Sequence, residues 1–186
     1  MTESPGRTQH PNESSRRHTP YNLLYDGINL EENIGSKGKR FVISRSYLFG
    51  TQELSEYSQA KRRQVLAEFE IDGRDYMLKN PVIVLSNSFA NGIQLIIIDG
   101  HHRVRYAPKF EITDIPCLII DAETLTSVIN EEKGTTLTPE QFLLETQQNV
   151  ANALESFDKR IVNYRPPQFL FGVNTVNELS KRFPTF

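Results

Sequence analysis

The stretch that decides the fold is Ile96-Ile97-Ile98-Asp99-Gly100-His101-His102-Arg103. Three β-branched residues in a row favour a buried strand, and the change to an acid, a glycine, two imidazoles and a guanidinium marks its end. Glycine accepts backbone conformations that other residues avoid, so Gly100 favours a sharp turn there. We therefore predict a strand, a turn at Gly100 and a helix that begins at the histidines.

The residues around this turn have the chemistry of an anion site. The first N–H groups of a helix lack partners within the helix, and the aligned peptide dipoles add partial positive charge there. The guanidinium of Arg103 offers several donors suited to two phosphate oxygens. We expect Gly100, His101, His102 and Arg103 to hold phosphate groups. The alternative is an ordinary capped turn whose imidazoles are solvated.

Asp99 has two interpretations that the sequence leaves open. At the N-cap position its carboxylate would accept hydrogen bonds from the N–H groups of residues 101 or 102. Otherwise it would bind a magnesium ion or a substrate hydroxyl. The first role is structural and the second is catalytic, so the role of Asp99 distinguishes a site that only binds a ligand from one that also catalyses a reaction.

A zinc centre is not expected. Adjacent residues point in different directions, so His101 and His102 seldom bind one ion together. The other two histidines lie in a polar N-terminal segment, and the single cysteine, Cys117, lies in an apolar run. A magnesium-dependent nuclease that uses Asp99 and one histidine is a minor hypothesis.

The flanking sequence completes the pattern of a known family. One strand-like run begins at Asn80-Pro81, and another begins at Ile115-Pro116. With Asp99-Gly100-His101-His102-Arg103 between them, these segments resemble the ParB/sulfiredoxin superfamily over residues 80–120. The resemblance implies an α+β fold, a small mixed sheet with flanking helices in a single domain.

The resemblance also implies a ligand. In this superfamily the loop with the glycine and the arginine binds nucleotide phosphates: CTP in partition proteins, ATP in sulfiredoxins, and ADP or ATP in free-serine kinases. The Asp-Gly-His-His-Arg spelling of residues 99–103 is closest to the serine kinases. We therefore expect ATP or ADP, with CTP as an alternative, together with Mg²⁺.

The chain departs from the family at three positions. Sulfiredoxins carry their catalytic cysteine where this chain has His101, so reduction of cysteine sulfinic acid is not expected. Pro108 falls where the interior of the family helix is expected, and Glu111 falls where a glycine usually caps it. Because proline lacks an N–H and its ring crowds the preceding turn, we predict a short or kinked helix after Gly100.

The segment before Pro81 is expected to form a second wall of the nucleotide site, as it often does in the superfamily. Ala60-Lys61-Arg62-Arg63 places three cations within one helical turn. Lys61 and Arg62 are candidate contacts to phosphate or nucleic acid. Glu56 is a candidate catalytic base, because the serine kinases place an acid in this region. The alternative for the cations is a solvated helix face.

Two glycine pairs predict hairpins. Asp72-Gly73 lies between alternating apolar residues and predicts a small hairpin over 69–77. Asn91-Gly92 favours positive φ and predicts an antiparallel pairing of strands 82–86 and 93–98.

Helix signals occur on both sides of these strands. Asp121 is expected to cap a helix that ends at Asn130, and Thr138-Pro139 is expected to begin the next helix. Before the strands, a helical apolar stripe is formed by Leu54, Tyr57, Val65, Leu66 and Phe69.

Length and composition limit the organisation of the chain. Its 186 residues, 38% of them hydrophobic, suit one domain with extensions. Residues 1–20 contain almost nothing apolar and are expected to be a disordered tail. We assign 21–130 to the nucleotide-binding domain and 131–186 to a helical C-terminal extension, which is too short for the helix-turn-helix array of partition proteins.

Charge and cysteine content bear on partners and compartment. A formal charge of −2 gives no global attraction to nucleic acid, so DNA is a possible partner that the charge does not indicate. One cysteine fits a reducing compartment, and no apolar run reaches the ~18 residues that span a bilayer. We expect a cytoplasmic protein that does not contact membranes.

Three functional hypotheses remain, in descending order. The first is a nucleotide-dependent phosphotransferase that acts on a small hydroxyl compound. The second is a ParB-like module whose nucleotide controls contacts with DNA or another partner without group transfer. The third is the nuclease described above.

Overall fold

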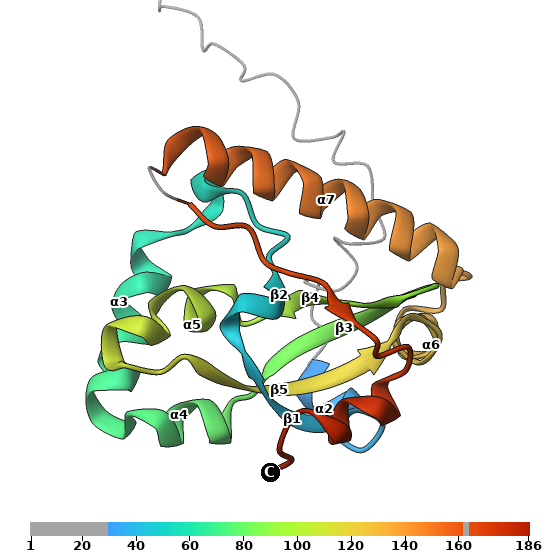
Figure 1. The fold of residues 1–186 in the computed structure, drawn as a ribbon, viewed down its shortest axis with the longest axis horizontal. Helices are drawn as coiled ribbons and strands as arrows, with labels where there is room; N and C mark the ends of the chain where they lie inside the picture. The colour runs from blue at the N-terminus through green and yellow to red at the C-terminus, as the bar shows by residue number, and fades with distance from the viewer. Residues whose placement is uncertain (1–29, 162–163) are drawn as a thin grey trace, which may run out of the picture.

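A computed structural model describes residues 30–161 and 164–186, in which a mixed six-stranded sheet is flanked by helices (Figure 1). This confirms the expected α+β class; the predicted tail, residues 1–20, lies outside the described residues. The strands are β1 (Lys39–Ser44), β2 (Leu48–Phe49), β3 (Val82–Phe89), β4 (Gly92–Asp99), β5 (Asp114–Asp121) and β6 (Leu170–Phe171).

The strand order is β1-β5-β3-β4-β2, and β6 also pairs with β4. Strands β3 and β5 run parallel, as do β2 and β4, and the other pairs are antiparallel. The central strands are continuous apolar runs because helices cover both faces of the sheet.

Alternate residues of the strands enter two separate cores. On β3, Val82 and Val84 face one core, and Ile83 and Leu85 face the other. The first core includes buried residues of α3 (Gln59–Asp72), α4 (Arg74–Lys79) and α5 (His101–Tyr106). The second includes residues of α2 (Leu30–Ile34), α6 (Ala122–Lys133) and α7 (Pro139–Arg160).

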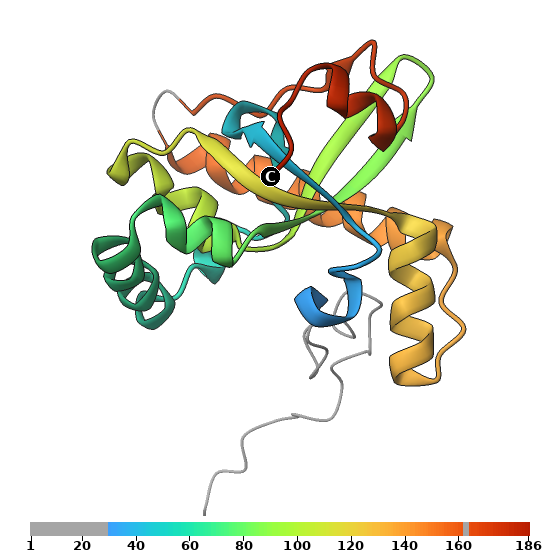
Figure 2. The ribbon, with the colours of Figure 1, turned by 90° about the horizontal axis from the view of Figure 1, so that it is seen from below.

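The helices divide between the two ends of the sheet. Helices α3, α4 and α5 gather at one end and α6 lies at the other (Figures 1 and 2). Helix α7 contacts both α6 and the short 3-10 helix η2 (Leu54–Glu56), which precedes α3. The remaining 3-10 helices are η1 (Arg45–Tyr47), η3 (Ala107–Phe110) and η4 (Val176–Lys181).

The predicted hairpin of β3 and β4 is confirmed, but its explanation was wrong. The strands pair antiparallel from Phe89↔Gly92 to Ile83↔Asp99. Neither Asn91 nor Gly92 has positive φ. Gly92 instead allows β6 to approach, because an added Cβ would lie 2.5 Å from the carbonyl oxygen of Leu170.

The predicted hairpin over 69–77 is wrong, since this segment is helical. Gly73, at φ 56°, ends α3 by donating its N–H to the carbonyl of Phe69 and is followed at once by α4. An Asp-Gly pair serves a helix C-terminus as well as a hairpin turn, and the burial of Phe69, Tyr76 and Met77 favours the helices here. The predicted helical stripe is also split, because α3 begins at Gln59 and Leu54 lies in η2.

The capping predictions hold. Asp121 accepts a hydrogen bond from the Thr124 N–H at the start of α6, although this helix runs to Lys133 rather than Asn130. Thr138 and Gln141 form a capping box at the start of α7. The helix after Gly100 is short, as expected from Pro108: α5 has six residues and continues as η3.

The segment after residue 130 is integrated into the sheet. In addition to α7, it contributes β6 to one edge, and Leu170 and Leu179 are buried in the first core. The carbonyl of Pro184 accepts a hydrogen bond of 2.9 Å from the Val42 N–H, which places the end of the chain beside β1 (Figure 1).

Candidate functional site

A pocket of about 290 Å³ lies where β4 ends and α5 begins, with η2 and the first turn of α3 as its opposite wall. All of the predicted site residues line it except Arg62, whose guanidinium lies instead over the ring of Tyr106. The fold thus brings the two predicted walls together from segments about 40 residues apart in sequence. The lining residues are Gln52, Glu56, Ser58, Lys61, Val65, Tyr76, Asp99, Gly100, His101, His102 and Arg103.

Gly100 is required by both its conformation and its surroundings. Its φ of 97° lies in the left-handed region that favours glycine. A Cβ at this position would lie 2.9 Å from Nη2 and 3.0 Å from Nε of Arg103, and 3.1 Å from Cγ2 of Val82. The glycine therefore lets the turn pass directly against the guanidinium.

Of the two interpretations of Asp99, the structure rules out the N-cap, and the role toward magnesium or a substrate hydroxyl stays a prediction. Gly100, not Asp99, is the N-cap residue of α5, and it makes no side-chain capping bond. The Asp99 carboxylate instead accepts a hydrogen bond of 2.9 Å from Nη2 of Arg103, one helical turn later. A charged partner is a stronger donor than a backbone N–H, which explains the preference.

Arg103 is fixed between Asp99 and the backbone. Nη2 also donates to the carbonyl of Pro81 at 3.3 Å, and the side chain is 15% exposed compared with 49% for Asp99. Its Nε is buried without a hydrogen-bond partner. The ion pair therefore orients a guanidinium that still has an unused donor.

His101 is a buried, neutral histidine. Its Nε2 accepts a hydrogen bond of 3.1 Å from the Thr51 N–H, and the Thr51 hydroxyl lies 2.9 Å from the same nitrogen. Nε2 is thus the unprotonated nitrogen, and burial lowers the pKa of His101 to about 3. This nitrogen is committed to holding the chain after β2 against α5, so it is unavailable to a phosphate.

His102 is the histidine with an unused polar atom. Its ring lies 4.9 Å from that of Tyr57, and its Nε2 is buried with no hydrogen-bond partner. Its pKa is lowered first by burial and then by the Lys61 ammonium, while a hydrogen bond to the Ser58 backbone opposes these effects. His102 is therefore neutral near pH 7 and faces a cation across the pocket.

The opposite wall is held in place by caps and by α7. Ser58 caps α3 by accepting the Lys61 N–H at 3.0 Å. The Glu56 carboxylate accepts the N–H of Glu53. The Leu54 N–H donates to Oγ of Ser156 on α7 at 2.9 Å.

Tyr57 connects this wall to the rest of the molecule. Its ring contacts Phe157 of α7 edge-on at 6.0 Å, and the Arg105 guanidinium lies 4.5 Å from its centre. Burial raises the pKa of Tyr57 to about 12. The wall is thus positioned in part by residues of α7 about 100 positions later in the chain.

Four lining residues were not predicted: Gln52, Ser58, Val65 and Tyr76. Ser58 had a usable signal, because a serine that precedes a run of helix-forming residues, here from Gln59 onward, is a typical N-cap. No pattern in the sequence distinguishes Gln52, whose Oε1 is buried in the structure without a hydrogen-bond partner.

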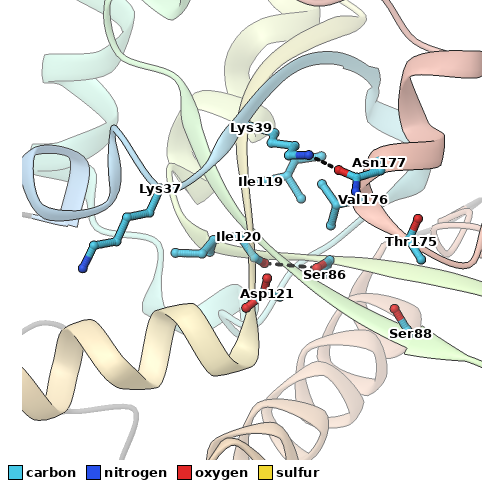
Figure 3. A pocket seen from close by; sticks show the side chains of 10 residues that line it. All are labelled: Lys37, Lys39, Ser86, Ser88, Ile119, Ile120, Asp121, Thr175, Val176 and Asn177. Atoms are coloured by element: carbon cyan, nitrogen blue, oxygen red, sulfur yellow. Dashed lines mark hydrogen bonds between the residues drawn. The ribbon is translucent and has the colours of Figure 1, made fainter.

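A second pocket, of about 370 Å³, lies at the other end of the sheet (Figure 3). Two hydrogen bonds join residues of this pocket: Lys39 donates to Asn177, and the Ser86 hydroxyl donates to the carbonyl of Ile120 at 3.2 Å. None of the predicted site residues lines it.

The two pockets differ in unsatisfied polar atoms. Across residues 30–161 and 164–186, three buried side-chain polar atoms have no hydrogen-bond partner, namely Gln52 Oε1, His102 Nε2 and Arg103 Nε. All three belong to residues that line the first pocket. Because unpaired buried polar atoms are costly, this concentration favours the first pocket as the ligand site.

No group of three or more His, Cys, Asp and Glu residues in the described part of the chain could hold a metal ion. Asp99 would therefore bind Mg²⁺ only with further ligands from water or a bound phosphate. This coordination suits magnesium, which commonly keeps waters and takes one or two carboxylates beside phosphate oxygens.

In comparisons with known proteins, no family model and no curated protein matches this chain. No helix within the described ranges is long and apolar enough to cross a membrane.

Proposed function

We propose that the pocket binds the phosphate groups of a nucleoside di- or triphosphate, and that the protein transfers a phosphoryl group to a small hydroxyl compound. The observation that carries the proposal is the set of unpaired buried polar atoms on Gln52, His102 and Arg103 around one pocket. A ligand with both acceptors and donors would satisfy these atoms.

One side of the pocket offers donors to an anion. Arg103 contributes a guanidinium already oriented by Asp99, and Lys61 contributes an ammonium from the opposite wall. The other ring nitrogen of His102 bonds to the Ser58 backbone, so the unpaired Nε2 donates to a phosphate oxygen only when the imidazole is protonated, a form that a bound phosphate stabilises. Charged donors on two sides of a phosphoryl group stabilise the charge that its equatorial oxygens carry during transfer.

The other side offers acceptors. Glu56 lines the pocket on the wall opposite Asp99, and Gln52 Oε1 lacks a donor. In the proposed reaction, Glu56 accepts the proton of the acceptor hydroxyl as its oxygen forms a bond to phosphorus. The bond from phosphorus to the leaving nucleotide oxygen breaks, and the nucleotide keeps that electron pair. A magnesium ion bound by Asp99 would neutralise charge on the phosphates.

The resemblance of residues 80–120 to the ParB/sulfiredoxin superfamily, with residues 99–103 closest to the free-serine kinases, supports this proposal. The second candidate is the ParB-like module that binds a nucleotide without group transfer. A specific observation favours it: both acids already accept hydrogen bonds from the protein, Asp99 from Arg103 and Glu56 from the Glu53 N–H. Acids used in this way can hold the site together without chemistry.

The two candidates are separated by binding and single-turnover measurements. ATP, ADP, CTP and GTP are titrated into the protein with magnesium by calorimetry, and the bound nucleotide is then mixed with a panel of small hydroxyl compounds. Phosphorylation of one acceptor by the wild type and its loss in Glu56→Gln support the phosphotransferase. Tight binding without transfer to any acceptor rejects it in favour of the module, and the absence of binding to every nucleotide rejects both.

A further inference from the structure

The candidate pocket is small for a whole nucleotide. Its volume of about 290 Å³ is at the lower limit of pockets for small molecules, which commonly measure 300–1,000 Å³. Polar side chains make up most of its lining, with Val65 and Tyr76 as the apolar members. A phosphate chain fits such a space, so the nucleoside of a bound nucleotide must lie outside its rim.

An aromatic ring lies along α5 from this pocket. Tyr106 is four residues after His102, on the same face of the helix, and the two rings are 6.4 Å apart. Tyr106 is partly exposed and packs with one side against the first core. Its surroundings are cationic: Arg62 lies 5.9 Å and Lys109 lies 5.7 Å from the ring centre.

The other ring beside His102 is less accessible to a ligand. Tyr57 is in contact with His102 at 4.9 Å and with the Arg105 guanidinium at 4.5 Å, and Phe157 meets it edge-on. The cations around Tyr106 lie farther from their ring and sit on long side chains. A planar ligand can displace them at little cost.

We propose that Tyr106 stacks against the base of the nucleotide whose phosphates occupy the pocket. This inference rests on the proposed phosphate binding and identifies the residue that recognises the nucleoside. Bases stack readily on tyrosine rings, and the neighbouring Arg62 and Lys109 add cation contacts to the base. Arg62, expected to contact phosphate directly, acquires a role at the rim instead.

The test compares ADP with inorganic pyrophosphate, which has the phosphates but no nucleoside. Both are titrated with magnesium into the wild type, Tyr106→Leu and Tyr106→Phe. Leucine keeps the apolar contact with the core and removes the ring, while phenylalanine keeps the ring. We expect Tyr106→Leu to bind ADP at least about fivefold more weakly, the lower end of the effect of removing a stacking ring. Its affinity for pyrophosphate and the ADP affinity of Tyr106→Phe should remain as in the wild type.

Retained pyrophosphate binding also shows that the pocket of the leucine variant is folded. Unchanged ADP affinity in Tyr106→Leu, or equal loss of ADP and pyrophosphate, would overturn the assignment of Tyr106 while leaving the phosphate site intact. Failure of the wild type to bind either compound would instead reject the proposed function, and this inference with it.

Discussion

Gly100→Ala adds one methyl group at the turn between β4 and α5, where the structure leaves no room for it. A non-glycine residue held at a φ near 97° costs about 1–3 kcal/mol. The new Cβ would also lie 2.9 Å from Nη2 of Arg103, the atom that donates to Asp99, so the guanidinium must move. Weakening this partly exposed ion pair costs up to about 1 kcal/mol more.

We therefore expect Gly100→Ala to lower the free energy of unfolding by about 1–4 kcal/mol, and the melting temperature by roughly 2–4 °C for each kcal/mol in a chain of this length. Because the displaced guanidinium belongs to the pocket, nucleotide affinity should fall as well. Urea denaturation followed by circular dichroism measures the first effect, and calorimetric titration with ADP at a temperature where the variant is folded measures the second.

Gly50→Ala is the matched control. Gly50 borders the same site, but the nearest atom to an added Cβ is Cδ2 of His101 at 3.8 Å, an ordinary contact. This variant should keep the stability and affinity of the wild type. A Gly100→Ala protein as stable as Gly50→Ala, with unchanged affinity for ADP, would refute the argument that the turn is fitted against Arg103.

Three further predictions follow from individual contacts. The pKa of His101 is lowered to about 3 in the folded protein and is near 6.5 in the unfolded chain, so its contribution to the free energy of unfolding should be fully present above pH 6.5 and should be lost as the pH falls towards 3. Urea denaturation of the wild type and His101→Gln at several pH values measures this, and the same pH dependence in both proteins would contradict it. Asp99→Asn should leave the protein folded and still able to bind ADP, but should reduce single-turnover phosphate transfer by several orders of magnitude if Asp99 positions magnesium; full transfer by the variant contradicts that role. Ser156→Ala removes the acceptor of the Leu54 N–H, so it should lower the free energy of unfolding by about 1 kcal/mol and, because η2 is then less well held, should also weaken ADP binding. A loss of stability without any change in ADP affinity would show that α7 does not position the pocket wall.

The sequence predicted those parts of the fold that depend on local patterns. The apolar run at 96–98, the glycine after it and the proline at 108 are local signals, and the strand, the turn and the short helix all occur as expected. The caps at Asp121 and Thr138 were predictable for the same reason.

Predictions that depended on distant partners did less well. Gly92 was interpreted through its own φ, whereas the structure explains it by the approach of Leu170, 78 positions later. Asp72-Gly73 is compatible with a hairpin or a helix end, and only the packing of Phe69 and Met77 decides between them. The N-cap interpretation of Asp99 could not be excluded from sequence, because the competing donor, Arg103, could not be placed there.

The candidate site shows the same division. The segment 99–103 was found from its residue types, and Glu56 and Lys61 from the resemblance to a family. Gln52 was missed because one buried amide oxygen leaves no pattern in the sequence. The different roles of the two histidines also depend on a distant residue, since Thr51 binds Nε2 of His101 while Nε2 of His102 has no partner.

The most direct test of the central claim is a calorimetric titration of wild type and Arg103→Ala with ADP in the presence of magnesium. If the pocket binds phosphate, the wild type has one site and the variant binds about 30-fold more weakly, which corresponds to roughly 2 kcal/mol for a lost charge-assisted contact. Circular dichroism of the variant confirms that it is folded. Equal affinity of the two proteins would mean that the nucleotide binds elsewhere, and no binding to the wild type would contradict the account altogether.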